Sequence, residues 1–381
     1  CFLVQWQMLW IMPELLKAPA REVLFWGDQD LMDLCFTGPL KETAGRKPWR
    51  FLDSAHLDSQ RPRFMISSHP SQALTVVVGG GTMGMDVAIV LARGGSQVTV
   101  VEPDAVKRQA LAAHVRHNLE PLGMAHRTER VQAVADLADV AWPGVSLLIE
   151  CIPEKLPLKQ ALFAQLAQMA PPETLLCSNS SSFPISAIAE GLPSAERMLG
   201  LHFFMPAHLV PLVEVVLGPK TAVQEAEQLC DFMRGCGSVP VLVRKDKPGF
   251  LANRMQHALA REAFALIDEG VASPEDVDAA VRFGFGFRFL AAGPVMQRDH
   301  AGLEVHTAAA ASMYPSLAVN AEPARVLQER VARGDLGMKT GQGFFSWTPE
   351  TQKAERERYD RLLRQGLDLL ASELPPLHPL D

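Results

Sequence analysis

The chain has 381 residues, enough for two or three domains of ordinary size and a sizeable buried core. Apolar residues make up 48% of it, charged residues 21%, and the formal net charge is −7. This balance is typical of a globular protein, excludes a disordered or collagen-like chain, and, with no basic cluster, argues against a nucleic-acid partner. The six cysteines form no CxxC pair, so we expect a reducing, cytoplasmic setting.

The first 64 residues differ in character from the rest. They contain four of the six tryptophans, and their apolar opening, residues 1–16, includes Gln5 and Gln7. This opening is too short for a bilayer-spanning helix and lacks a basic start, so neither an anchor nor a signal peptide is expected. Because Met65 is a natural start for the pattern that follows, we predict that residues 1–64 are not part of the fold and represent an over-extended reading frame or a fused fragment. The intact mass of the protein from its native source would decide this.

From residue 74 onwards, short apolar runs alternate with patterns of helical period. We predict strands within 74–81 and at 97–102, 145–150, 174–178, 198–204, 210–216 and 238–243, and helices at 82–93, 104–122, 158–170 and 223–235. Strands that alternate with helices indicate a mostly parallel, doubly wound sheet. The predicted fold class is therefore α/β, with a Rossmann-type sheet.

The pattern changes at residues 245–250, KDKPGF, where charges and a Pro-Gly pair interrupt the chain. Strand patterns vanish beyond this point. A long helix is expected at 250–270, and Ser273 is expected to cap the next helix. Further helices to about residue 333, a glycine-rich turn region at 334–345 and a tail helix at 349–374 complete the chain. The second half is therefore predicted to be all-α.

A GxGxxG motif lies between the first predicted strand and the first predicted helix. Gly79 permits a tight turn, Gly81 lets a pyrophosphate approach the backbone, and Gly84 lets strand and helix pack closely. Glu102 ends the next strand, where a carboxylate can accept hydrogen bonds from ribose hydroxyls and repel the extra phosphate of NADP. NAD is therefore the expected cofactor, although Arg108, one helical turn further on, keeps NADP open. The predicted cofactor loop also includes Thr82 and Met83.

A histidine and a glutamate are the first catalytic candidates. His202 lies in an apolar strand pattern at the carboxyl end of the sheet, and Glu214 follows within VPLVEVV. A carboxylate among apolar neighbours is costly to bury without a partner. A histidine paired with a carboxylate is what a general base for alcohol oxidation requires. From the residues alone, a core histidine beside an unrelated glutamate is an equally good interpretation.

Other polar residues have two interpretations each. The stretch 178–183, SNSSSF, offers hydroxyls at the ligand-binding edge of the sheet or forms a polar turn. Asn253 is a poor helix former without a polar partner, so it is a binding group or a solvent-exposed residue. His114 and His117 share a helix face, but no third ligand is near them, so no metal site is predicted.

Six motifs, in order and spacing, make residues 74–347 resemble the 3-hydroxyacyl-CoA dehydrogenases of fatty-acid β-oxidation, including the 3-hydroxybutyryl-CoA dehydrogenases. The motifs are VVVGGGTMG, IECIPEKLPLK, SNSSSF, GLHFFMPAHLVPLVEVV, KPGFLANR and LGMKTGQGFF. The resemblance implies that His202 is the catalytic base, Glu214 its partner, Ser181 a hydroxyl near the reacting oxygen and Asn253 a hydrogen-bonding group for the substrate.

The resemblance also implies roles that the residues alone do not suggest. Glu154 and Lys159 match positions that line the nicotinamide side of the cofactor site, whereas from the sequence both belong to a solvated helix start. The implied domains are an NAD-binding domain at 74–245, a helical substrate and dimerisation domain at 246–347, and a helical tail at 348–381.

The chain departs from the family pattern at one position that matters. The family usually has HFFNP, and this chain has Met205 in place of that asparagine. An apolar thioether cannot make the hydrogen bonds of an amide, so substrate identity or rate is affected more than reaction type. The aromatic stretch at 283–294 could also alter the acyl pocket.

We therefore expect an NAD-dependent dehydrogenase that oxidises the L-3-hydroxyl of an acyl-CoA, working as a homodimer with no membrane or nucleic-acid partner. One alternative keeps the scaffold and takes a free polar 3-hydroxy acid, as the gulonate and carnitine dehydrogenases do. The other is a non-catalytic NAD(H)-binding protein similar to the crystallins of this superfamily.

Overall fold

The computed structural model describes residues 66–67 and 69–377, so the predicted extra segment 1–64 lies outside the described residues. The expected strands are present with bounds within two residues of the predicted ones. They are β1 (Leu74–Val78), β2 (Gln97–Val101), β4 (Val145–Glu150), β5 (Leu175–Ser178), β6 (Met198–Phe203), β7 (Leu212–Val216) and β8 (Val239–Val243). A further strand, β3 (Val131–Val134), was not predicted.

The eight strands form one sheet in the order β3-β2-β1-β4-β5-β6-β7-β8. Every neighbouring pair is parallel except β6 and β7, which are antiparallel. The prediction of a mostly parallel, Rossmann-type sheet is confirmed. Strand order reverses between β1 and β4, and ligands of open α/β sheets bind outside the carboxyl ends of the strands at such a point.

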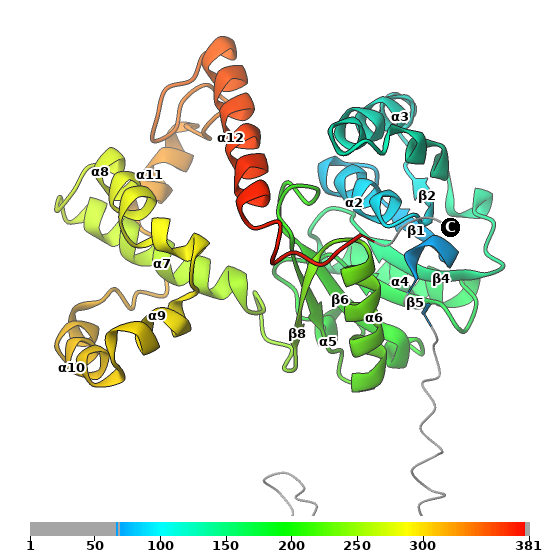
Figure 1. The fold of residues 1–381 in the computed structure, drawn as a ribbon, viewed down its shortest axis with the longest axis horizontal. Coiled ribbons are helices and arrows are strands. Elements are labelled where there is room, and N and C mark those ends of the chain that lie inside the picture. The colour runs from blue at the N-terminus through cyan, green and yellow to red at the C-terminus, as the bar shows by residue number, and fades with distance from the viewer. Residues whose placement is uncertain (1–65, 68, 378–381) are drawn as a thin grey trace, which may run out of the picture. The chain divides into compact units, whose positions relative to one another are not determined.

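Helices cover both faces of this sheet (Figure 1). They are α2 (Thr82–Arg93), α3 (Ala105–Leu119), α4 (Leu156–Met169), α5 (Ile185–Ile188) and α6 (Val223–Gly235). Alternate strand residues point to opposite faces, so Val77 packs with α2, α3 and α6 while Val76 packs with α4 and α5. The two apolar cores therefore enclose the sheet from both faces.

After β8 the described residues form helices and turns, as predicted. The helices are α7 (Ala252–Asp268), α8 (Pro274–Ala279), α9 (Pro294–Ala301), α10 (Leu303–Met313), α11 (Arg325–Arg333) and α12 (Pro349–Leu369). The side chain of Ser273 caps α8 by accepting a hydrogen bond from the backbone N–H of Asp276 at 3.1 Å. The tail helix ends at Leu369, five residues before the predicted end. The domain boundaries themselves stay a prediction.

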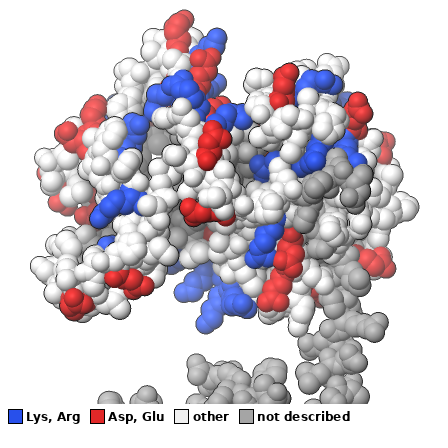
Figure 2. Space-filling view, in the orientation of Figure 1, with Lys and Arg blue, Asp and Glu red and all other residues white. Residues whose placement is uncertain are grey.

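The surface of these helices is rich in apolar groups. None of the helices α7 to α12 contains a fully buried residue in the described chain. Large apolar side chains of these helices are exposed instead, among them Met255, Val295 and Val331. Charges of both signs occur over the face shown in Figure 2. Among the described residues, no helix has the length and hydropathy needed to cross a membrane.

Candidate active site

The glycine loop between β1 and α2 is built by close backbone contacts. Gly79 has a φ of +103°, a backbone conformation that residues other than glycine rarely adopt. A Cβ on Gly84 would lie 1.7 Å from the carbonyl oxygen of Gly79, so only glycine lets the helix begin this close to the loop. The structure therefore brings the predicted glycines together at the end of β1.

The start of α2 suits a dinucleotide phosphate. Gly81 precedes the helix and supplies no side-chain cap, so the first-turn amides, which include those of Thr82 and Met83, are not covered by a capping side chain. A Cβ on Gly81 would meet nothing within 4 Å, so the backbone is open to an approaching group. Uncapped amides at a helix N-terminus attract anions. Met83 packs against the apolar core beneath.

Glu102 is placed against this loop, where it was predicted to bind ribose. Its carboxylate is buried and accepts hydrogen bonds from the backbone N–H of Gly80 at 2.8 Å and of Asp104 at 3.0 Å. Arg108 donates to the backbone carbonyls of Glu102 and Pro103 at 2.8 and 2.7 Å. The arginine thus makes backbone contacts, and a negative charge lies at the ribose end of the loop, which favours NAD over NADP.

His202 and Glu214 lie directly opposite each other in the antiparallel pair β6 and β7. Nδ1 of His202 is 2.7 Å from a carboxylate oxygen of Glu214, and both side chains are buried. Nε2 of His202 is 3.0 Å from Oγ of Ser181. Because a carboxylate only accepts, Nδ1 carries the hydrogen of a neutral ring and Nε2 is left as the acceptor.

Glu214 also connects the sheet to the first helix after it. Its second carboxylate oxygen accepts hydrogen bonds from the backbone N–H groups of Leu251 and Ala252 at 3.0 and 2.7 Å. Burial raises the pKa of Glu214, but the hydrogen bonds from His202 and these two amides outweigh it, so the pKa lies below its ordinary value. Glu214 is therefore ionised and orients the His202 ring.

These bonds make the fold sensitive to acid. A carboxyl whose pKa is lower in the folded chain stabilises it above the unfolded pKa, and that contribution is lost as the pH falls through the folded value. We expect the urea concentration at the midpoint of unfolding to decrease as the pH drops from the ordinary glutamate pKa of 4.5 through the lower folded value. The Glu214→Gln variant should be less stable than the wild type at neutral pH, and its urea midpoint should decrease less as the pH is lowered. An equal pH dependence in the wild type and the variant would contradict this role of Glu214.

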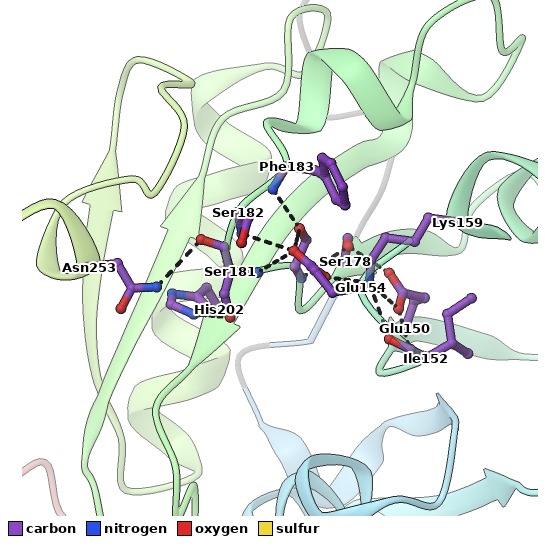
Figure 3. A network of polar contacts seen from close by, with 11 residues as sticks. Glu150, Ile152, Glu154, Lys159, Ser178, Ser181, Ser182, Phe183, His202 and Asn253 are labelled. Carbon is purple, nitrogen blue, oxygen red and sulfur yellow. Dashed lines mark hydrogen bonds and ion pairs between the residues drawn. The ribbon is translucent and has the colours of Figure 1, made fainter. Parts of the chain in front are cut away.

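Ser181 and Asn253 meet beside the His202 ring (Figure 3). The side-chain amide of Asn253, in the first turn of α7, donates to the backbone carbonyl of Ser181 at 3.4 Å. The rings of Phe204 and Phe250 lie 4.6 and 5.7 Å from the His202 ring, measured between centroids. Nε2 therefore faces the Ser181 hydroxyl, which Asn253 adjoins, and two phenylalanine rings lie beside the histidine ring.

Of the two residues expected at a solvated helix start, Glu154 is partly exposed and Lys159 is buried. Lys159 is 1% exposed and its ammonium contacts Glu150 at 2.7 Å and Glu154 at 3.1 Å. The sequence interpretation of a solvated helix start is wrong for Lys159 because α4 turns its first-turn face toward the sheet. Whether either side chain touches the cofactor stays a prediction.

Sequence reasoning gave no individual role to two polar residues of this region, Glu150 and Asn179. Glu150, at the end of β4, is fully buried and accepts a hydrogen bond from Oγ of Ser178 at 2.7 Å. Asn179 accepts one from the backbone N–H of Phe203 at 2.8 Å, which ties the loop after β5 to the strand that carries His202. A charged residue that ends an apolar strand was the signal available for Glu150.

His114, weighed above as a metal ligand, contacts a buried carboxylate instead. His114 lies 3.1 Å from a carboxylate oxygen of the buried Asp86. Cys177 is buried in β5, and burial raises the pKa of its thiol far above the ordinary value, as expected for an inert thiol. Met205 is 64% exposed on the loop that follows β6.

Comparison with known proteins places these features in a family context. Residues 75–247 match the family described as "3-hydroxyacyl-CoA dehydrogenase, NAD binding domain", and residues 249–347 match "3-hydroxyacyl-CoA dehydrogenase, C-terminal domain". The chain is 35% identical over 293 residues to the 5-formyl-3-hydroxy-2-methylpyridine 4-carboxylate 5-dehydrogenase of Mesorhizobium japonicum, which covers 75% of this chain and 95% of that protein.

Two further similarities extend the comparison. The chain is 37% identical over 312 residues to the 3-hydroxyadipyl-CoA dehydrogenase of Escherichia coli, a match that covers 79% of this chain and 62% of that longer protein. A crystal structure of a 5-formyl-3-hydroxy-2-methylpyridine 4-carboxylic acid 5-dehydrogenase, described as an NAD+ dependent dismutase, superposes with a TM-score of 0.73 at 33% identity. It covers 77% of this chain and 97% of that one.

Proposed function

The chain belongs to the 3-hydroxyacyl-CoA dehydrogenase family, and on that basis we propose that it oxidises the L-3-hydroxyl group of an acyl-CoA to a ketone. NAD is its cofactor, and it is an oxidoreductase that acts on CH–OH groups. The observation that carries the proposal is the buried His202, held by Glu214 on one ring nitrogen and facing Ser181 with the other.

In the proposed reaction, His202 takes the hydroxyl proton. Its Nδ1–H donates to Glu214, so the lone pair of Nε2 is available to a substrate hydroxyl that approaches Ser181. Glu214 then stabilises the imidazolium, because it is a buried carboxylate at hydrogen-bond distance. The proton leaves His202 for solvent before the next turnover.

The remaining residues orient the substrate and the cofactor. NAD, when bound, accepts the hydride that leaves the carbon of the substrate. The uncapped amides at the start of α2 and the carboxylate of Glu102 would hold its pyrophosphate and ribose. Ser181 and Asn253 would donate hydrogen bonds to the reacting oxygen and the neighbouring carbonyl of the substrate.

The decisive assay follows the absorbance of NADH with acetoacetyl-CoA as oxidant. Turnover is the expected result. NADH binding without turnover on any 3-hydroxy or 3-oxo substrate would instead favour the non-catalytic alternative.

A specific observation supports a second candidate, a free carboxylic acid as substrate. Met205 replaces the family's asparagine on the loop after His202, and a relative that matches nearly its whole length is named for a pyridine carboxylate. Under the acyl-CoA proposal, Met205→Asn should raise kcat/KM for acetoacetyl-CoA by roughly three- to tenfold, the worth of one hydrogen bond. A panel of 3-oxo acids with and without CoA measures this. A wild type that turns over only the free acids, and loses activity in Met205→Asn, would overturn the acyl-CoA proposal.

A homodimer is also proposed, with its interface on the helices that follow β8. The support is physical: in the described chain, α7 to α12 expose large apolar side chains and bury none completely. Such faces are usually covered by a partner. A cytoplasmic location and a role in fatty-acid β-oxidation stay predictions.

A further inference from the structure

A buried carboxylate on helix α2 takes no part in the proposed reaction. Asp86 follows Gly84 by two residues and is only 2% exposed. Burying a charge costs free energy that its contacts must recover, and even a well-paired buried charge is weak evidence for stability alone. The contacts that Asp86 makes therefore indicate its use.

Asp86 is contacted from two other parts of the chain. Its Oδ1 lies 3.1 Å from Nε2 of His114 on α3 and 3.2 Å from Nδ1 of His208, which follows β6. Its Oδ2 accepts a hydrogen bond from the backbone N–H of Ala207 at 3.2 Å. Burial raises the pKa of Asp86, but the contacts with His114 and His208 outweigh it, so the pKa lies below its ordinary value. The carboxylate is therefore ionised at neutral pH.

Two residues of α2 attach the β6–β7 loop, residues 204–211, to this helix. Asp86 holds Ala207 and His208, and the guanidinium of Arg93 donates to the backbone carbonyl of His208 at 3.4 Å. Seven residues, close to two helical turns, separate Asp86 from Arg93, so the two lie on one face of α2. The loop is thus tied to the helix whose first-turn amides would hold the pyrophosphate of NAD.

The same loop joins the two strands that carry the proposed catalytic pair. His202 lies on β6 and Glu214 on β7, and the two residues are opposite each other in the register. The ring of Phe204, the first residue of the loop, is 4.6 Å from the His202 ring. Further along, the backbone N–H groups of residues 209 and 210 both donate to the carbonyl of Pro206, at 3.0 and 2.9 Å. These bonds make the loop a tight turn, so a displacement at its middle also displaces its ends.

We propose that Asp86 is a positioning residue: it anchors the β6–β7 loop to α2 so that Phe204 stays packed against His202. The inference rests on the proposed function for the role of His202 in the reaction. His208 belongs to the anchor because it lies on the loop, whereas His114 reaches the same oxygen from α3, which lies beside α2 (Figure 1). The two histidines therefore distinguish anchoring of the loop from the mere pairing of a buried charge.

Three single variants use this difference. Asp86→Ala should lower kcat by about tenfold and His208→Ala by about fivefold, because a loop without its anchor misplaces the groups around His202. The KM for NADH should change by less than about threefold in both, since neither substitution alters the first-turn amides of α2. His114→Ala is the matched control: it removes the same kind of ring from the same oxygen but leaves the loop contacts, so kcat should stay within about twofold.

A double-mutant cycle tests the path to His202. In a Phe204→Ala background, Asp86→Ala should lower kcat by only about a further twofold, because the ring that it positions is already absent. If Asp86→Ala does not fold, His208→Ala takes its place in the cycle, since it removes only the loop-side contact of the carboxylate.

Three kinetic outcomes would overturn the proposal. Equal losses from Asp86→Ala with and without Phe204 would show that it does not act through this ring. Equal losses in His208→Ala and His114→Ala would show that the cluster only pairs a buried charge. A loss confined to the KM for NADH would show that Asp86 serves the cofactor loop instead.

Amide hydrogen exchange separates this proposal from the proposed function. In Asp86→Ala, the amides of Leu209 and Val210 should exchange about tenfold faster than in the wild type, and in His114→Ala they should be unchanged. Their acceptor is the carbonyl of Pro206, so faster exchange reports movement of the loop and not the loss of an acceptor. Unchanged exchange in Asp86→Ala would overturn the anchor whatever the enzyme's substrate. A wild type that turns over no substrate, with faster exchange in the variant, would retain the anchor and refute only the proposed function.

Discussion

His202→Ala is expected to lower kcat by roughly a thousandfold, because no other described side chain lies where it can take the proton from the substrate hydroxyl. Nε2 of His202 faces Ser181, and the buried carboxylate of Glu214 accepts a hydrogen bond from Nδ1. The loss should fall on kcat, since the proposed role of the histidine is proton transfer and the glycine loop predicted to bind NAD follows a different strand, β1. Stopped-flow or steady-state NADH assays measure it.

Two controls make this result specific. NADH affinity, measured by fluorescence titration, should change by less than about threefold in His202→Ala. His202→Gln keeps a donor for Glu214 but cannot act as a base, so it should lose as much activity while it keeps more of the wild-type stability. Substantial activity in both variants would rule out His202 as the base.

Gly84→Ala is expected to cost about 3 kcal/mol of folding free energy or more, the upper range for forcing an extra methyl group into a packed site. The added Cβ would lie 1.7 Å from the carbonyl oxygen of Gly79 and 3.4 Å from Cγ1 of Val77. Backbone cannot yield as a flexible side chain can, so α2 must shift away from β1 or the loop must distort. Thermal unfolding and NADH titration should both show a large loss.

Gly81→Ala is the matched control three residues away. A Cβ at this position meets no atom within 4 Å, and the backbone φ of −72° suits any residue. The melting temperature should therefore stay within about 2 °C of the wild type. NADH affinity should nevertheless fall, because the methyl group occupies space that the pyrophosphate needs. If both variants lose only stability, or both lose only NADH affinity, then Gly84 and Gly81 do not have the separate roles of packing and of leaving space for the pyrophosphate.

Local patterns were sufficient for most of the fold. The strand, glycine loop and helix at residues 74–93 carry their own signals, because β-branched runs, glycine spacing and helical period are all properties of neighbouring residues. β3 was not predicted, because its residues carry no such local signal. It is a four-residue edge strand with only partly buried side chains, so its sequence has no strong alternation, and pairing with β2 decides its conformation.

The types of residue in the candidate site could be predicted from the sequence, but the contacts between them could not. His202 and Glu214 were both catalytic candidates because they are polar residues in apolar strands. Their pairing, however, depends on the antiparallel register of β6 and β7. Asn253 lies 72 residues after Ser181 in the chain, and they meet where the start of α7 donates a backbone hydrogen bond to Glu214 of β7. No local sequence pattern predicts a contact between residues so far apart in the chain.

By itself, the sequence determined the fold class, the cofactor loop and the residue types available for proton transfer, because each depends on neighbours along the chain or on ordered motifs. The tertiary structure decided which charges are buried and what they hold. Lys159 belongs to a stretch that a sequence interpretation leaves in solvent, and it is enclosed because α4 packs its first turn over the end of β4. Burial and long-range hydrogen bonds arise from segments that meet only after folding, so they have no local signal.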